Sequence, residues 1–340
     1  MPSQMQAAFL EGPERITIAE APVPRPGPGE VLLRVALCGI CGTDVHAYRL
    51  FPHRKPVVMG HEMVGEIAEL GEGVEDLKVG DRVALNPLLR CGSCFWCRRG
   101  QWDLCPSTLR GSAGGFAQFR VAEAVYLHRI PPTLQFTEAA LTEPVAVALH
   151  AVGNSGLRLG DRAVIYGAGA IGLLTLGVVK EAGANEIYAV EVSPLRAQVA
   201  RTLGADRVLI PGQDEVVSEI KKQTGVGADV VFECAGAAGA VESAGKVVRR
   251  GGEIVFVGSS LEPVPVPLRA WLVKGIRCRF VINYGDEFPQ ALEWLGRKRV
   301  SSEKVISGVI PLKRIATDGF QPLMAAEAPG KILVDPWMER

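Results

Sequence analysis

The chain has 340 residues, of which 48% are hydrophobic and 22% are charged, a composition typical of a globular enzyme of about two domains. Its 37 basic and 37 acidic residues give a formal net charge of zero, so no overall field favours a nucleic-acid or anionic membrane partner. The sequence contains no basic segment followed by an apolar leader and no apolar run long enough for a membrane helix, and we expect a cytoplasmic protein.

Residues 1–149 read as short β-strands separated by turns. Strand-like runs at 29–37, 63–70 and 80–87 are bounded by glycine and proline. Repeated short strands predict a β-barrel or a β-sandwich. We therefore assign residues 1–149 to a β domain, and we expect the less regular residues from about 288 to 340 to complete it.

Potential metal ligands gather in three short segments of this β domain, CGICGTDVH, GHE and TEP. In chain order, these segments and their flank contribute Cys38, Cys41, Thr43, Asp44, His46, His61, Glu62, Glu143 and His150. A catalytic zinc needs about three protein ligands and one open position, and Cys41, His61 and Glu62 offer suitable donors. Each of the three also has an ordinary interpretation, as a buried thiol, a core histidine or a surface acid, and spacing alone does not join the segments.

The stretch 91–105 holds half of the eight cysteines of the chain, namely Cys91, Cys94, Cys97 and Cys105. Because thiols stay reduced in the cytosol, the spacing C-x2-C-x2-C-x7-C indicates metal ligands rather than disulfides, and it suits zinc or an iron–sulfur centre. Four protein ligands fill a tetrahedral shell and leave no position for a substrate. We therefore predict a structural metal site, with zinc as the main candidate.

The same cysteine lobe permits a different interpretation, a zinc module that binds nucleic acid. Arg98 and Arg99 lie in the sequence beside Trp96 and Trp102, and basic and aromatic side chains together can stack on bases. Two arginines in a chain of zero net charge usually form only a solvated surface, so we expect no nucleic-acid partner.

From about residue 150 to 287, apolar strands alternate with amphipathic helices. The runs RAVIYGAG, EIYAVEV, ADVVFECAG and GEIVFVG read as strands, and the segments between them read as helices. This alternation predicts βαβ units, a parallel sheet and an α/β fold of the doubly wound Rossmann type over residues 150–287.

The first strand of this region leads into YGAGAIG, which contains G-x-G-x-x-G at Gly167, Gly169 and Gly172. The pattern is weak alone, but here it follows a strand and opens a helix, as in a dinucleotide-binding loop. Gly167 permits the tight turn, Gly169 lets the backbone approach a pyrophosphate, and Gly172 lets the helix pack on the strand. The phosphates would lie at the helix N-terminus, beside Ala170 and Ile171.

Glu191 ends the next strand, where an acid binds the adenine ribose hydroxyls in folds of this type. A carboxylate there repels a 2′-phosphate, so we expect NAD rather than NADP, although Arg196 offers a cation for a phosphate or for stacking on adenine. A solvated acid at a strand end is the alternative for Glu191. Further cofactor contacts are expected after the later strands, at Cys234, Ala235, Gly236, Val257, Gly258, Ser259, Ile282 and Asn283.

Taken together, GICGTDVH, GHE, the four-cysteine lobe, TEP and GAGAIG occur in the order seen in zinc-dependent medium-chain alcohol dehydrogenases. The chain resembles this family over essentially its whole length, and most closely the branch of sorbitol, butanediol and threonine dehydrogenases. The resemblance implies a GroES-like β-barrel catalytic domain beside the Rossmann cofactor domain. It also implies a homotetramer, with a dimer as the alternative.

The resemblance further implies which residues hold the catalytic metal. The ligand cysteine of the family follows Gly-Ile and precedes Gly-Ser/Thr-Asp, which selects Cys41 over Cys38. His61 and Glu62 match the Gly-His-Glu of the family. Glu143 matches an acid that ligates the metal or its water and can exchange places with Glu62.

The implied reaction is the reversible NAD-linked oxidation of a secondary alcohol, diol or polyol to the ketone, with one catalytic and one structural zinc in each chain. Zinc would act as a Lewis acid on the substrate hydroxyl, and hydride would pass to the nicotinamide. Thr43 would accept the hydroxyl proton and pass it through the nicotinamide ribose to His46. Asp44 would orient His61.

One position departs from the sorbitol dehydrogenase pattern. Those enzymes carry Arg-Tyr shortly before a proline, and this chain has Asn283 and Tyr284 before Pro289. A smaller diol or secondary alcohol therefore fits the sequence as well as sorbitol does, and L-threonine 3-dehydrogenase is an alternative. A zinc-free quinone or enone reductase of the same fold is a further alternative, but such enzymes lack the three-ligand set.

Overall fold

The structure, a computed structural model, describes residues 2–108 and 113–339. It divides the chain into two units, which are Met1–Glu143 together with Ile306–Arg340, and Pro144–Val305. We call the first the β unit and the second the α/β unit. The β unit is therefore discontinuous in sequence, because its last strands follow the whole of the α/β unit.

The boundaries of the units differ from those expected at residues 149 and 288. Helix α3 (Thr142–Gly153) runs across the first boundary, so no turn marks it in the sequence. Helix α9 (Glu287–Gly296) belongs to the α/β unit, as does Val300, which lies against Gly177 of that unit. The irregular pattern after residue 288 therefore still belongs to the α/β unit up to Val305.

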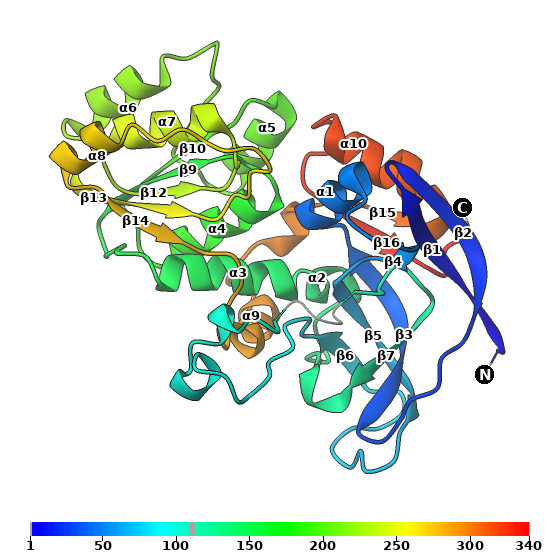
Figure 1. Ribbon diagram of the computed structural model, residues 1–340. Helices are drawn as coiled ribbons and strands as arrows, with labels where there is room; N and C mark the ends of the chain where they lie inside the picture. Colours follow the sequence, from blue (N-terminus) through cyan, green and yellow to red (C-terminus); the bar gives the residue numbers. More distant parts are fainter. Residues whose placement is uncertain (1, 109–112, 340) are drawn as a thin grey trace. The chain divides into compact units, whose positions relative to one another are not determined.

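The β unit consists of two sheets and several short helices (Figure 1). One sheet has the strand order β2-β1-β4, and the seven-stranded sheet has the order β15-β16-β3-β5-β6-β8, with β7 paired to β3. The strands are β1 (Gln4–Gly12), β2 (Arg15–Pro22), β3 (Glu30–Gly39), β4 (Val57–Val58), β5 (Glu62–Leu70), β6 (Arg82–Leu85), β7 (Phe119–Glu123), β8 (Leu127–Arg129), β15 (Ile306–Pro311) and β16 (Lys331–Asp335). The helices are α1 (Gly42–Leu50), α2 (Phe136–Ala139) and α10 (Gln321–Met324).

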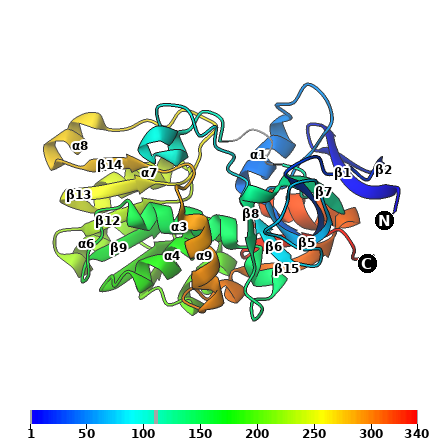
Figure 2. The same ribbon diagram turned by 90° about the horizontal axis from the view of Figure 1, so that it is seen from below.

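Buried side chains from strands of both sheets form a hydrophobic core, and Figure 2 shows these strands from below. Leu10 of β1, Leu33 of β3, Met63 of β5 and Val334 of β16 are buried in it. Strand β3 is central to the unit because it pairs with β5, β7 and β16. Its last residue, Gly39, pairs with residues of both β5 and β16, so three segments distant in sequence meet at this point.

The α/β unit contains six parallel strands in the order β11-β10-β9-β12-β13-β14, which confirms the predicted doubly wound sheet. The strands are β9 (Arg162–Tyr166), β10 (Glu186–Val190), β11 (Arg207–Leu209), β12 (Ala228–Glu233), β13 (Val248–Phe256) and β14 (Arg277–Phe280). The helices are α4 (Ala170–Glu181), α5 (Pro194–Thr202), α6 (Val216–Thr224), α7 (Ala238–Val247), α8 (Leu268–Lys274) and α9. Helices cover both faces of the sheet, with α6 and α7 above and α4 below it in Figure 1.

The central strands of this sheet are largely apolar because both of their faces are covered. Ala163, Val164 and Ile165 of β9 are at most 1% exposed, which explains why this run lacks the alternation of a half-buried strand. Strand β14 lies at the sheet edge, and its residues are all exposed. Within residues 2–108 and 113–339, no helix combines the length and apolar character needed to cross a membrane.

Candidate active site and metal centres

Cys41 lies at the N-terminus of α1, and Asp44 of the same helix fixes its position. The backbone N–H of Cys41 donates to Asp44 Oδ2 at 3.0 Å, and the backbone N–H of Gly60 donates to Asp44 Oδ1 at 3.3 Å. Burial raises the pKa of Asp44, against the opposing effect of His61. Because the buried carboxylate accepts from both segments, it joins the turn at Cys41 to the turn that precedes His61.

His61 lies between the turn at Gly60 and the start of β5. Gly60 has a φ of 89°, in the left-handed region that favours glycine. His61 Nδ1 is 3.8 Å from Asp44 Oδ1, which is an ion-pair distance rather than a hydrogen bond. Asp44 therefore accepts hydrogen bonds from two backbone N–H groups and lies at ion-pair distance from His61. Burial acts to lower the pKa of His61, but Asp44 and Cys41 together raise it well above its ordinary value.

Glu62 is the first residue of β5, and its side chain is enclosed on all sides. The residue is 1% exposed and pairs with Gly39 of β3, where an added Cβ would lie 2.1 Å from Glu62 Oε2. Only glycine at position 39 therefore leaves room for this carboxylate. Glu62 Oε1 accepts a hydrogen bond from Lys331 Nζ at 2.6 Å, whereas Oε2 has no hydrogen-bond partner among the described residues.

The ligand atoms of Cys41, His61 and Glu62 lie within 4.8 Å of one another. A thiolate, an imidazole and a carboxylate are ligands that zinc accepts, and three protein ligands leave a fourth position open for a substrate. A buried carboxylate oxygen without a partner is costly, and a cation beside it would remove that cost. The three residues therefore fit a zinc ion of the catalytic type.

Glu143 lies in the first turn of α3 and interacts electrostatically with this group. Burial raises the pKa of Glu143 to about 7, the charge of His61 opposes the rise, and Glu62 adds to it. Its carboxylate is not one of the three donors that lie within 4.8 Å of one another. In this structure, Glu62 is therefore the acid that accompanies Cys41 and His61.

The remaining candidates of the CGICGTDVH segment occupy different environments. Cys38 is fully buried, and burial raises the pKa of its thiol well above the ordinary value, as for a core residue. Thr43 and His46 lie three positions apart on α1 and therefore on one side of the helix. Thr43 is exposed and His46 is partly buried. Partial burial, followed by the charge of Arg49, lowers the pKa of His46.

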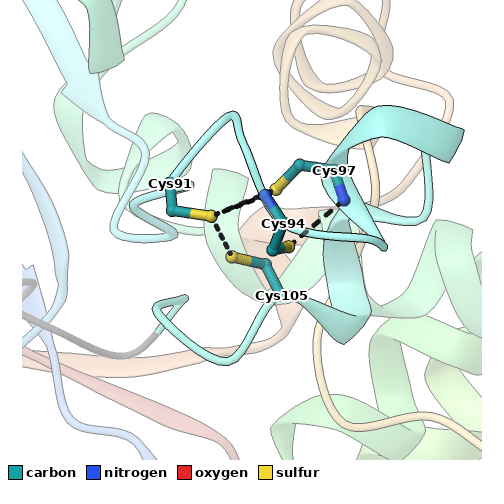
Figure 3. Close-up of side chains that lie close together, drawn as sticks. All are labelled: Cys91, Cys94, Cys97 and Cys105. Atoms are coloured by element: carbon teal, nitrogen blue, oxygen red, sulfur yellow. Dashed lines mark hydrogen bonds between the residues drawn. The ribbon is translucent and has the colours of Figure 1, made fainter.

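The four cysteines of the lobe converge on one point, as Figure 3 shows. Cys91 Sγ lies 3.7 Å from Cys105 Sγ and 4.0 Å from Cys97 Sγ, and all eight cysteines of the chain are free thiols. The backbone N–H of Cys94 donates to Cys91 Sγ at 3.3 Å, and that of Cys97 donates to Cys94 Sγ at 3.4 Å. Backbone hydrogen bonds from Ser93 and Cys94 lower the pKa of Cys91 to about 6. Four such sulfurs fit a tetrahedral zinc ion with no open position.

Basic and aromatic side chains of the lobe contact one another. The guanidinium of Arg99 lies 3.7 Å from the ring centre of Phe95, and that of Arg90 lies 4.2 Å from the ring centre of Trp102. Trp102, one of the two tryptophans considered for stacking on bases, therefore already has a cation on its ring. Trp96 and Arg98 of the same lobe are exposed.

The glycine-rich loop connects β9 to α4 at the point where the strand order reverses. Gly167 has a φ of 85°, and Gly169 is the N-cap of α4 with no atom within 4 Å of an added Cβ, so the backbone there is accessible. An added Cβ at Gly172 would lie 1.8 Å from the carbonyl oxygen of Gly167. The three glycines therefore have the three local environments that a dinucleotide-binding loop requires.

Glu191 follows β10 and joins the glycine-rich loop to α5. Its Oε2 accepts from the backbone N–H of Ala168 at 2.6 Å, and its Oε1 accepts from the backbone N–H of Ser193 at 2.8 Å. The residue is 5% exposed, so it is not a solvated acid at a strand end. Each carboxylate oxygen accepts one of these bonds and keeps capacity for a ribose hydroxyl. Arg196 lies in α5 and is partly buried.

The other predicted cofactor residues all follow the carboxyl ends of parallel strands. They are Cys234–Gly236 after β12, Val257–Ser259 after β13, and Ile282 and Asn283 after β14. Glu233, which the sequence reasoning missed, shapes the first of these loops because its Oε1 accepts from the backbone N–H groups of Ala235 and Gly236 at 3.0 and 2.9 Å. An acid ending an apolar strand is the signal for such a residue.

Sequence reasoning also missed Lys331 and Gly39. Lysine is normally read as a surface residue, yet Lys331 is 3% exposed and opens the apolar run KILVD. The signal was a lysine directly before a strand that is otherwise buried. The partner, Glu62, is 269 positions away in the sequence, so no local pattern joins the two.

Comparison with known proteins agrees with these two units. Residues 27–132 match the alcohol dehydrogenase GroES-like domain, and residues 170–297 match the zinc-binding dehydrogenase domain. The chain is 38% identical to (R,R)-butanediol dehydrogenase of Bacillus subtilis (strain 168) over 354 residues, which cover 98% of this chain and 100% of that protein. The chain belongs to the zinc-dependent medium-chain alcohol dehydrogenase family. It is therefore an oxidoreductase, and the predicted family and fold class are confirmed.

Other members of this dehydrogenase family are similar over nearly the same length. Sorbitol dehydrogenase of Bacillus subtilis (strain 168) is 34% identical, covering 94% of this chain and 91% of that protein. A zinc-binding dehydrogenase of Sinorhizobium meliloti 1021, solved with NADP, has a TM-score of 0.92 at 31% identity, covering 98% of this chain and 100% of that one. An alcohol dehydrogenase from E. coli CFT073, solved with NADH, has a TM-score of 0.91 at 29% identity, with the same coverage.

Proposed function

We propose that this dehydrogenase catalyses the reversible NAD-linked oxidation of a small diol or related secondary alcohol to the ketone at a zinc ion held by Cys41, His61 and Glu62. The observation that carries the proposal is the group of three donors within 4.8 Å of one another. Among the described residues, the buried Oε2 of Glu62 has no hydrogen-bond partner. Membership of the zinc-dependent family supports this use of the donors. A zinc-free quinone or enone reductase has no need for them.

When bound, zinc supplies a Lewis acid that makes a substrate hydroxyl easier to deprotonate. The chain contributes the charges around that position. Asp44 holds the turns that carry Cys41 and His61 through two backbone hydrogen bonds. The role of Glu62 is to bring a negative charge into a buried site, where it counters part of the charge of the ion.

Thr43 and His46 are proposed to carry the hydroxyl proton away from the substrate. A threonine hydroxyl can accept one proton while it donates its own, so Thr43 can relay the proton without becoming charged. His46 then accepts the proton at a ring nitrogen. Its lowered pKa leaves the ring neutral at pH 7, which is the form that accepts a proton. Glu143 is proposed as a second acid that ligates the ion or its water when Glu62 does not.

The proposed substrate class rests on the relatives and on one departure from them. The relatives named above are dehydrogenases of butanediol and sorbitol, which both carry neighbouring hydroxyl groups. This chain has Asn283 where sorbitol dehydrogenases have arginine, so we favour a small diol over a long polyol. L-Threonine remains the alternative substrate.

A panel of substrates tests the assignment directly. We expect the highest kcat/KM for a short vicinal diol, a lower value for sorbitol, and a value for simple secondary alcohols between them. A preference for L-threonine would favour the threonine alternative. Reduction of quinones with NADPH, without oxidation of any alcohol, would contradict the proposal.

NAD is proposed as the cofactor because of Glu191. Its buried carboxylate, held by two backbone N–H groups, repels a 2′-phosphate. Related structures contain NADH in one case and NADP in another, so membership of the family does not decide between them. Glu191→Ala should weaken NAD binding more than NADP binding, as measured by calorimetry. Equal losses for both cofactors would contradict this role.

Two zinc ions per chain are proposed, one in the lobe and one at Cys41. Elemental analysis of the purified protein tests the stoichiometry. A value near two supports both sites. A value near one, retained in Cys41→Ser but lost in Cys94→Ser, would leave only the structural site.

We propose that the protein is cytoplasmic. We also propose that it is a homo-oligomer, with a tetramer favoured over a dimer. The support for self-association is the edge strand β14, whose outer edge pairs with no described strand and which carries the exposed Phe280 (77%). Together with the exposed Ile282 (75%), which follows the strand, this edge suits pairing with a second copy. Eight free thiols suit a reducing compartment. Light scattering of the wild type and of Phe280→Glu tests the interface, and a monomeric wild type would contradict it.

A further inference from the structure

Lys331 is the most deeply buried lysine in the part of the chain that the structure describes. It is 3% exposed, and its Nζ donates to Glu62 Oε1 at 2.6 Å and to the carbonyl oxygen of Ile40 at 3.0 Å. Lysines are almost never buried to this extent unless they are paired. Glu62 is therefore held by a buried cation that is not one of the metal ligands.

The sheet fixes where this amino group lies. Strand β16 pairs with β3, and β3 pairs with β5, so Lys331 and Glu62 begin strands on either side of β3. The backbone N–H of Ile40 donates to the carbonyl oxygen of Ile332 at 3.0 Å, which holds the segment after β3 against β16. Because two fixed acceptors hold its amino group, Lys331 has little freedom to move away from Glu62.

The two oxygens of Glu62 consequently differ. Lys331 donates to Oε1, whereas Oε2 lacks a hydrogen-bond partner among the described residues. One oxygen of this carboxylate lies within 4.8 Å of the ligand atoms of Cys41 and His61. A carboxylate can bind a cation through one oxygen or through both. Binding through both would fill a further position around the ion, which is the position that a substrate needs.

We propose that Lys331 is a positioning residue that engages one oxygen of Glu62, leaves only the other oxygen for the metal ion, and thereby keeps one coordination position free for the substrate. This inference rests on the proposed zinc site at Cys41, His61 and Glu62. It assigns to a residue of the last strand a part in setting the number of ligands, in addition to its contribution to stability.

Cobalt substitution measures this effect without relying on turnover. Co²⁺ is exchanged into the open site while zinc stays in the cysteine lobe, with metal contents checked for each sample. The visible absorption of Co²⁺ is strong with four ligands and weakens as the number of ligands rises. The variants are Lys331→Met, which removes the charge, and Lys331→Arg, which keeps it. Lys331→Leu, which also removes the charge and the hydrogen-bond donor, serves if the methionine variant does not fold.

Lys274→Met is a matched control in the α/β unit. Lys274 is partly buried, and its amino group donates to the carbonyl oxygens of Gly245 and Lys246, so its removal also deletes hydrogen bonds of a lysine, one of them partly buried. It should lower the melting temperature and leave the cobalt spectrum unchanged. A purely structural role of Lys331 would give this same result.

We expect Lys331→Met to weaken the visible cobalt bands and to lower kcat/KM by roughly 10- to 100-fold, the range typical of partners that hold metal ligands. Lys331→Arg should restore the spectrum. A folded Lys331→Met protein, or the leucine variant in its place, with the wild-type cobalt spectrum would overturn the inference.

The failure of the zinc-site proposal would look different. The wild type should show a cobalt–thiolate absorption band that is lost in Cys41→Ser. Absence of that band in the wild type would mean that the metal site itself is wrongly assigned. Presence of the band, together with an unchanged spectrum in Lys331→Met, would refute only the role of Lys331.

Discussion

The four sulfurs of the lobe come from the single stretch 91–105, whereas the site at Cys41 draws on the end of β3, the start of β5 and the start of β16. The lobe offers four donors of one kind, which fill a tetrahedral shell. The site at Cys41 offers three donors of different kinds, together with the buried charges of Asp44 and Lys331. Both sites lie in the β unit.

In this protein, the site with four ligands takes all of them from one short loop, and the site with three ligands takes them from separate segments of the sequence. A site made by one short loop can close around an ion by adjusting only that loop. A site made by several strands is held at fixed distances by the sheet, so it can keep a position unfilled. We therefore expect perturbation of the lobe to change stability and perturbation of the strand-built site to change chemistry.

The largest effect is expected for Cys41→Ser. Loss of the thiolate removes a ligand from the incompletely enclosed site, and we expect a decrease in kcat of roughly a thousandfold or more, since a Lewis-acid metal supplies several kcal/mol. NAD affinity, measured by calorimetry, should remain within a few-fold of the wild type because the glycine-rich loop is in the other unit. Normal turnover in this variant would show that the strand-built site is not catalytic.

Cys94→Ser should act on stability instead. Structural zinc sites contribute directly to folding free energy, and we expect a loss of about 3 kcal/mol or more, seen as a lower melting temperature. Activity per folded molecule should stay near the wild-type value at low temperature. A selective loss of turnover at unchanged melting temperature would remove the distinction between the two sites.

Asp44→Asn should have an intermediate effect on the strand-built site. The buried carboxylate accepts from the backbone N–H groups of Cys41 and Gly60, and the amide can replace only one of these acceptors. We expect metal affinity or kcat/KM to fall by roughly 10- to 100-fold. Titration of the metal-depleted variant with zinc measures the affinity, and an unchanged value would mean that the turn at Cys41 is fixed by other contacts.

Metal removal should separate the sites in time. A chelator can approach an ion that has an open position more readily than an ion enclosed by four sulfurs, so the first zinc should leave together with activity. Removal of the second should be slower and should coincide with the fall in melting temperature. The zinc content of the protein, measured after increasing times of exposure to the chelator, follows both steps. Simultaneous loss of both ions would argue against one open and one closed site.

The smallest effect is expected for pH dependence at His46. Partial burial, and to a smaller extent the charge of Arg49, lowers the pKa of His46. The neutral ring therefore remains the main form at pH values somewhat below the ordinary pKa of histidine. Alcohol oxidation should decline as pH falls through this lowered pKa, because the protonated ring cannot accept another proton. In His46→Gln, the pH–rate profile should lose this acidic limb. A wild-type profile in the variant would exclude His46 from the proton path.

The sequence predicts features that are encoded within short stretches. The parallel sheet follows from buried apolar runs such as the one containing Val164, and the fit of Gly167 and Gly172 follows from a local strand–turn–helix pattern. The cysteine lobe could also be predicted, because its four cysteines lie within residues 91–105. The unit boundary near Val305 was not predicted, because no further strand follows α9 in the α/β unit and the strand–helix alternation therefore stops before the unit does.

Features that depend on strand pairing could not be predicted. Lys331 and Glu62 meet only because β16 and β5 both flank β3, and Gly39 is essential only because the carboxylate of Glu62 lies opposite it. Asp44 could be placed near the site, but the sequence did not show that its oxygens accept from the backbone N–H groups of Cys41 and Gly60. Features whose residues lie close together in the chain could be predicted, and features whose residues are distant in the chain could not.

The separation of Lys331 from Glu62 by 269 positions has a consequence for biosynthesis. At roughly 5–20 residues per second, a ribosome needs about 15 to 50 seconds to proceed from the glutamate codon to the lysine codon. During that interval the whole α/β unit emerges, while the acid that later faces the ion has no cationic partner. All four cysteines of the lobe are therefore synthesised well before Glu62 can acquire its cationic partner.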